Sequence, residues 1–247
     1  MANSPRALDQ GGFGATQRTD SWWLQPLAIA AYLGAFSVYA TWAALENANY
    51  EWGPYLSPMY SPLIKPDWWP LSPAFLILWA PGGFRATCYY YRKAYYRSLF
   101  LDPAACAVGE PAKRSYCGET KFPFILQNLH RFMFYVAVIF IGLLWHDAYK
   151  AFFWADGVHM GVGTVVMILN AFLLSGYTFG CHSFRHLIGG RRDSFAGAGS
   201  AHGCWMGATK LNESHQNWAL VSMFWVGFTD FYIRMVASGV ITDFKIF

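Results

Sequence analysis

Five long apolar stretches constrain this chain more than any other feature of its sequence. They predict helices at about 22–45, 73–97, 124–150, 158–188 and 214–240. A helix that crosses the hydrocarbon core of a bilayer needs about 20 mostly apolar residues, and each stretch is at least that long. Charged residues make up only 13% of the chain, whereas an average soluble domain has about 25%. The sequence therefore predicts an all-α membrane protein, in which residues 22–247 form one bundle of five transmembrane helices in the lipid bilayer.

The positions of lysine and arginine predict how this bundle is oriented. If the N-terminus is cytoplasmic, only four of the 18 Lys and Arg residues fall on the outer side: Lys65, Lys150, Arg234 and Lys245. The positive-inside rule therefore favours a cytoplasmic N-terminus and a C-terminus outside. Residues 1–21 lack the apolar core of a signal peptide, so we expect them to form a cytoplasmic N-terminal arm. The net charge of +4 follows from the basic cytoplasmic segments and indicates no nucleic-acid partner.

The densest group of chemically active side chains follows the fourth apolar stretch. Cys181, His182, Arg185 and His186 fall within two helical turns. Such groups are costly inside a membrane unless they are paired or bind something. We therefore interpret this segment as part of a site that holds a redox centre inside the bundle.

Two other predicted helices carry a thiol or an imidazole at a similar depth. At a rise of about 1.5 Å per residue, four side chains lie roughly 10–13 Å below the cytoplasmic ends of three helices. They are Cys88, His130, Cys181 and His182. Two thiols and two imidazoles match the ligands of a Rieske-like [2Fe–2S] cluster, in which two Cys bind one iron and two His bind the other. Because Cys181 and His182 are adjacent, their side chains diverge by about 100°, and His186 or His215 is the replacement if one of them faces away.

Three other interpretations of these residues remain open. Haem b could be held by His130 with His182 or His186, but haem gives no role to the two cysteines. A tetrahedral zinc site could use the same four ligands. Core Cys and His residues of a transporter or a structural anchor would need no redox centre. The spacing of Cys106 and Cys117 matches no zinc or ferredoxin motif, so we predict that neither is a ligand.

Three local patterns concern structure rather than chemistry. Pro81, followed by two glycines in the middle of the second apolar stretch, predicts a kink. The Gly- and Ser-rich segment 189–214 predicts a surface loop. Asp230 and Arg234 lie four residues apart near the outer end of the fifth helix, a spacing that predicts an ion pair.

Three segments resemble one particular family of membrane anchors. They are RATCYYYRKAYYR at 85–97, LQNLHR at 126–131 and CHSFRHLIGG at 181–190. They resemble the membrane anchor subunit of actinobacterial, mycobacterial-type succinate dehydrogenase, a succinate:quinone oxidoreductase, and the resemblance extends from Trp22 to Gly239. It implies an iron–sulfur centre in place of haem, and flavoprotein and iron–sulfur protein partners on the cytoplasmic face. It also implies a multi-pass protein of the inner (plasma) membrane and a quinone acceptor, which we expect to be menaquinone, and it leaves open a higher oligomer of the complex.

The resemblance also implies a function for this chain within such a complex. As the anchor, it would pass electrons from a soluble iron–sulfur subunit through the redox centre to the quinone. The chain carries no flavin or nucleotide motif, so we expect succinate to be oxidised in another subunit and assign no catalytic residue here. Arg85, Tyr89 and Tyr177 are the candidates for the quinone site, because they could hydrogen-bond a quinone carbonyl or supply protons.

Overall fold

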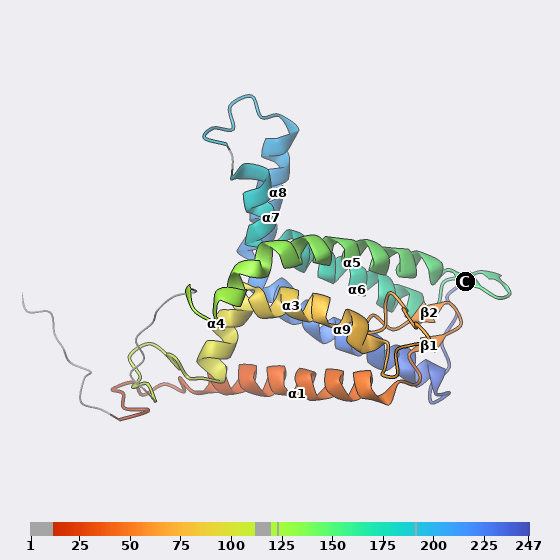
Figure 1. Cartoon of the computed structure of the whole chain (residues 1–247), viewed down its shortest axis with the longest axis horizontal. Coiled ribbons are helices and arrows are strands. Elements are labelled where there is room, and N and C mark those ends of the chain that lie inside the picture. The colour runs from red at the N-terminus through yellow and green to blue at the C-terminus, as the bar shows by residue number, and fades with distance from the viewer. Residues whose placement is uncertain (1–11, 112–119, 123, 191) are drawn as a thin grey trace, which may run out of the picture.

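The computed structural model describes residues 12–111, 120–122, 124–190 and 192–247, and it is mostly helical. In these ranges, four helical segments are long and apolar enough to cross a membrane. They are α1 (Leu24–Glu46), the segment Phe124–Lys150 formed by η2 (Phe124–Leu129) and α5 (His130–Lys150), α6 (Val162–Phe179) and α9 (His215–Ala237). All four run along the long axis of the molecule (Figure 1). A bundle of helices that could span a membrane is therefore present, whereas the count of five and the orientation remain predictions.

The second predicted helix, 73–97, is divided in the structure. It consists of α2 (Ala74–Ile77), α3 (Trp79–Thr87) and α4 (Tyr89–Ser98). The first division lies just before Pro81, which has no N–H to donate to the carbonyl of Ile77. The second lies at Cys88, whose backbone is extended with φ −66° and ψ 133°. The prediction of one helix over 73–97 is therefore wrong, although the predicted interruption near Pro81 is present.

The fourth predicted helix, 158–188, is also divided. A hairpin of β3 (Phe153–Trp154) and β4 (Gly157–Val158) precedes α6, so the helix begins later than predicted. Its other end is interrupted at Cys181, which is extended with φ −68° and ψ 142°, and α7 (His182–Gly189) follows. Next comes α8 (Ser200–Glu213), in the segment predicted as a surface loop, so that prediction is wrong. Helices α7 and α8 pack together and project away from the bundle (Figure 1).

The core of the bundle contains both of the buried cysteines. A cluster of buried side chains joins α3, α4, α5, α6 and α9 near the end of the bundle where α4 lies. Its members are Phe84, Cys88, Tyr91, Phe134, Ala137, Tyr177, Cys181, Ala219 and Met223. Gly176 allows α6 and α9 to approach closely here, because a Cβ at this position would lie only 2.5 Å from the Trp218 ring. The candidate site is thus built into the packed core.

The described part of the predicted N-terminal arm is attached to the segment that follows α4. Gly14 N donates to the carbonyl of Gly109 (3.0 Å), and Gly109 N donates to the carbonyl of Ala15 (2.9 Å). Arg18 Nη1 donates to the carbonyl of Cys106 (3.0 Å). These contacts tie residues 14–18 to 106–109. Residues 1–11 and Cys117 lie outside the described residues.

The opposite end of the bundle is closed by a loop and a buried ion pair. The loop carries the hairpin of β1 (Glu51–Trp52) and β2 (Tyr55–Leu56). Arg234 Nε donates to Asp230 Oδ2 at 2.8 Å, and Arg234 Nη1 lies 2.6 Å from Glu46 Oε2. Ser57 of the loop donates to the same Asp230 carboxylate. The predicted pair of Asp230 and Arg234 is confirmed, and it joins α9 to α1 and to the loop.

Candidate functional site

Four helix boundaries meet at one end of the bundle, and each places a thiol or an imidazole there. Cys88 separates α3 from α4, and Cys181 separates α6 from α7. His130 is the first residue of α5, and His215 is the first residue of α9. The site is therefore assembled from the ends of helices rather than from their middles, and both cysteines begin a new helix. The positive end of a helix dipole favours a negatively charged group nearby.

Within this site, each thiol lies against one imidazole. His130 Nε2 is 2.9 Å from Cys181 Sγ, and Cys88 Sγ is 3.6 Å from His215 Nε2. Both cysteines are only 2% exposed. The structure thus brings together three of the four predicted ligands, and His215 occupies the fourth position.

The other two candidate histidines lie elsewhere. His182 follows Cys181 directly, but it is the first residue of α7 and its side chain is exposed. His186, one turn further along α7, is also exposed. The sequence already indicated that Cys181 and His182 would not both face the site. They are neighbours in the chain, and the side chains of two neighbouring residues of a helix point in different directions.

Aromatic rings cover the two imidazoles of the site. The ring of Phe84 stacks on that of His130 with centroids 4.9 Å apart, and the ring of Tyr177 stacks on that of His215 with centroids 5.1 Å apart. Thr87 Oγ1 lies 3.0 Å from His130 Nδ1, which orients the other nitrogen of this ring toward Cys181. His215 Nδ1 is buried and has no hydrogen-bond partner within the described part of the chain. The two thiols are therefore buried, and the two imidazoles are half-buried under aromatic rings.

The donor set can be compared with the two kinds of metal centre that use it. Among the described residues, no three His, Cys, Asp or Glu side chains are grouped closely enough to hold a single metal ion. A zinc site needs four ligands around one ion, whereas a [2Fe–2S] cluster takes its four protein ligands as two pairs. Two separate pairs of side chains fit a binuclear cluster better than a single zinc ion. In a Rieske cluster two Cys bind one iron and two His bind the other, so these four side chains match its ligand types but not its pairing.

A cavity of about 230 Å³ inside the bundle lies next to this site. Arg85 and Tyr177 both line it, and most of its other lining residues are apolar. The guanidinium of Arg85 lies 4.6 Å from the centre of the Tyr177 ring and donates to Ser222 Oγ at 3.0 Å and to Tyr91. The Tyr177 hydroxyl is buried without a partner in the ranges that the structure describes.

Tyr89, the third residue predicted for the quinone, is not near this cavity wall. It is 68% exposed and lines a different cavity, at the beginnings of α1 and α4. At the interruption at Cys88, α4 turns away from α3 (Figure 1), and Tyr89 and Arg85 line different cavities. The structure therefore brings together two of the three candidates.

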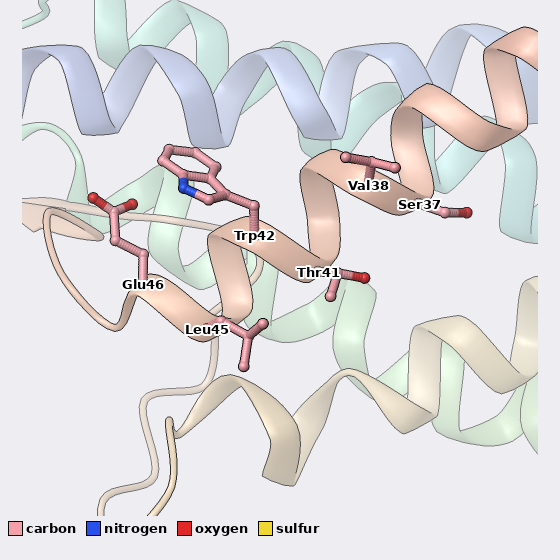
Figure 2. A pocket seen from close by; sticks show the side chains of 6 residues that line it. All are labelled: Ser37, Val38, Thr41, Trp42, Leu45 and Glu46. Atoms are coloured by element: carbon pink, nitrogen blue, oxygen red, sulfur yellow. The ribbon is translucent and has the colours of Figure 1, made fainter.

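A hollow on the surface of α1 carries no comparable chemistry. Figure 2 shows its lining residues, which all belong to this one helix: Ser37, Val38, Thr41, Trp42, Leu45 and Glu46. The ionisable member, Glu46, is paired with Arg234. We assign no site to this hollow.

Comparison with known proteins identifies the family. The family model described as actinobacterial succinate dehydrogenase subunit SdhC matches residues 24–239. The chain belongs to this family. A solved structure described as the Mycobacterium smegmatis Sdh1 complex in the apo form shares 42% sequence identity with it, with a TM-score of 0.87, and the match covers 94% of each chain. No curated protein matches this chain.

These comparisons confirm the family that the three sequence segments indicated. The chain is a membrane subunit of an actinobacterial succinate dehydrogenase complex, which is an oxidoreductase. Its several apolar helices make it a multi-pass membrane protein.

Proposed function

We propose that this SdhC-family subunit anchors the soluble flavoprotein and iron–sulfur subunits to the cytoplasmic face of the plasma membrane and delivers their electrons to a quinone. The observation that carries the proposal is the set of two buried thiols, each against a half-buried imidazole, at one end of the bundle. We assign Cys88, Cys181, His130 and His215 as the ligands of a [2Fe–2S] cluster. When bound, such a cluster supplies one-electron transfer, and its histidine ligands raise the reduction potential toward that of a quinone.

The surrounding residues support this role through orientation and exclusion of water. Thr87 holds the ring of His130, and Phe84 covers the face of that ring. Tyr177 does the same for the face of His215. Orienting partners of this kind commonly change metal affinity or activity by about 10- to 100-fold when they are removed.

The same packing favours a cluster over a haem. A haem iron needs an imidazole nitrogen that faces an open space for the porphyrin, but His130 Nε2 faces Cys181. The predicted second haem ligands, His182 and His186, are exposed on α7. A transporter or structural anchor would give no reason for two thiols and two imidazoles to meet at four helix ends.

The cavity lined by Arg85 and Tyr177 is the proposed quinone site, with menaquinone as the expected quinone. Reduction of a quinone to a quinol requires hydrogen-bond donors at the carbonyl oxygens, and these two side chains carry donors at the cavity wall. Tyr177 also stacks on His215, so the cavity adjoins one of the proposed ligands. This proximity would keep the electron-transfer distance short.

Low-temperature EPR and optical spectroscopy of the purified complex, reduced with dithionite, test the proposed centre. We expect a Rieske-like signal of low average g and no Soret band. As a control, His202→Ala should retain the signal, because His202 is exposed on α8. A Soret band without such a signal would assign the subunit to the haem anchors, and a complex with no iron in this subunit would indicate a structural anchor.

Replacing Tyr177 with phenylalanine tests the proposed quinone site. The hydroxyl has no protein partner among the described residues, so its removal should cost no stability. We expect the KM for quinone to rise about five- to tenfold, which corresponds to the loss of one hydrogen bond. The matched control is Tyr89→Phe, which removes an exposed hydroxyl and should change nothing. An unchanged KM in the Tyr177 variant, with the EPR signal intact, would remove Tyr177 from the quinone site.

A further inference from the structure

A second cavity, of about 570 Å³, lies at the same end of the bundle as the candidate cluster site. The beginning of α1 meets α4 there, and the junction of α8 and α9 also lines the cavity (Figure 1). It is distinct from the cavity that Arg85 and Tyr177 line, because the two share no lining residue. His215, one of the proposed cluster ligands, also lines this cavity, but the function proposed above assigns no ligand to the cavity itself.

Two unpaired cations line this second cavity. Lys93 and Arg97 lie one turn apart on α4, and neither has a carboxylate partner within the residues that the structure describes. Two other charged lining residues, Arg18 and Asp20, neutralise each other through a hydrogen bond of 2.8 Å. The remaining one, Glu213, is exposed. The wall formed by α4 therefore carries two positive charges, and neither is paired with a carboxylate among the described residues.

The wall formed by α1 is apolar, and it continues into a furrow along the bundle. Trp22, Pro26 and Ile29 line the cavity at helical spacing. The same spacing continues through Tyr32, Phe36 and Tyr39. These three line an apolar furrow of about 420 Å³ together with residues of α9, so one face of α1 joins the two spaces. The α9 residues of the furrow are Phe224, Gly227, Phe228 and Phe231.

We propose that an anionic phospholipid binds here, with its phosphate at Lys93 and Arg97 and an acyl chain in the furrow between α1 and α9. A positively charged pocket at a helix end suits the headgroup, because basic residues near the membrane surface attract anionic lipids. An apolar furrow that runs along a spanning helix suits the chain. A quinone head is uncharged and would leave the two cations unpaired, and an acidic segment of a soluble partner would not use the furrow.

Lipid binding to the whole complex in detergent, measured by native mass spectrometry with added phosphatidylglycerol, tests this proposal. Phosphatidylcholine serves as the neutral lipid. We expect one phosphatidylglycerol to bind in clear preference to phosphatidylcholine, and Lys93→Gln with Arg97→Gln to weaken it roughly 30-fold. The matched control is Arg192→Gln with Lys210→Gln, the same charge change on residues that do not line the cavity, and it should retain the lipid.

A second variant tests the acyl chain separately. A Cβ at Gly227 would meet Phe36 at 3.6 Å, an ordinary contact, so Gly227→Leu should fold while filling the furrow. We expect this variant to lose the long-chain lipid but to bind glycerol phosphate as the wild type does. Equal binding of both lipids, or no effect of the α4 double variant, would overturn the proposal. Loss of the soluble subunits from the double variant, with lipid retained, would assign the cations to an acidic partner. None of these lipid-binding measurements depends on the EPR signal or on quinone reduction, so they can fail without affecting the test of the proposed function.

Discussion

Replacing His215 with alanine is expected to abolish quinone reduction by the complex, whereas the same change at His182 should leave the rate within about twofold. His215 lies 3.6 Å from Cys88 and is covered by Tyr177, but His182 is exposed. Loss of an orienting partner alone costs about 10- to 100-fold, so loss of a ligand should cost at least about 100-fold. The cysteines allow a parallel comparison, in which Cys181→Ser should abolish the activity and Cys204→Ser, at an exposed site, should not.

The measurement is succinate:quinone reductase activity together with EPR of the reduced complex. Succinate oxidation with a soluble dye that accepts electrons from the soluble subunits serves as the control, because it should remain normal in every variant that assembles. An inactive His182 variant beside an active His215 variant would contradict the assignment made from the structure. It would favour the ligand set first predicted from the sequence.

Breaking the buried ion pair at the other end of the bundle should have the largest effect on stability. Asp230 is 0% exposed and Arg234 2% exposed, and Asp230 also accepts hydrogen bonds from Tyr39 and Ser57. Replacing Arg234 alone leaves Asp230 as an uncompensated buried charge, which typically costs 3–5 kcal/mol, whereas replacing Asp230 leaves Arg234 still paired with Glu46. We expect about 3 kcal/mol for Arg234→Met, the lower end of that range, because Glu46 is partly exposed and water reaches this end of the bundle.

A double variant provides the control for this second prediction. Asp230→Leu with Arg234→Met removes both charges and replaces them with apolar groups, which often restores most of the lost stability. Thermal unfolding of the complex in detergent should therefore rank the wild type first, the double variant next and Arg234→Met last. If the double variant unfolds below both single variants, the pair does not act through its charges.

The sequence predicted the long helices well but not their interruptions. Helices α1, α5 and α9 lie within a few residues of the predicted ranges, because unbroken apolar runs define them. No glycine or proline occupies the interruption at Cys88, so the helix propensities of the local residues did not predict it. Helix α8 was missed for the opposite reason: its glycines are typical of a loop, but the helix packs on α7, where the guanidinium of Arg185 lies 4.8 Å from the Trp205 ring.

The sequence predicted only part of the candidate site. The depth of a side chain along a helix can be found by counting residues, but the direction in which the side chain points cannot. Counting along regular helices placed Cys88, His130 and Cys181 at one level, and the structure brings them together. The choice of His215 depends on a tertiary contact, since the Asn212 side chain donates to the carbonyl of Gly180 at 2.8 Å. This bond holds the junction of α8 and α9 beside the end of α6, and no local pattern predicts it.

The convergence of four helix boundaries at one end of the bundle also bears on the membrane potential. Moving one elementary charge across a full 100 mV costs or yields about 2.3 kcal/mol. In the proposed orientation, an electron that enters from the cytoplasm reaches these helix ends after crossing only a fraction of that voltage. Electron transfer as far as the proposed cluster would then depend only weakly on voltage, and a strong dependence of turnover on the potential would report the later movement of electrons or protons at the quinone.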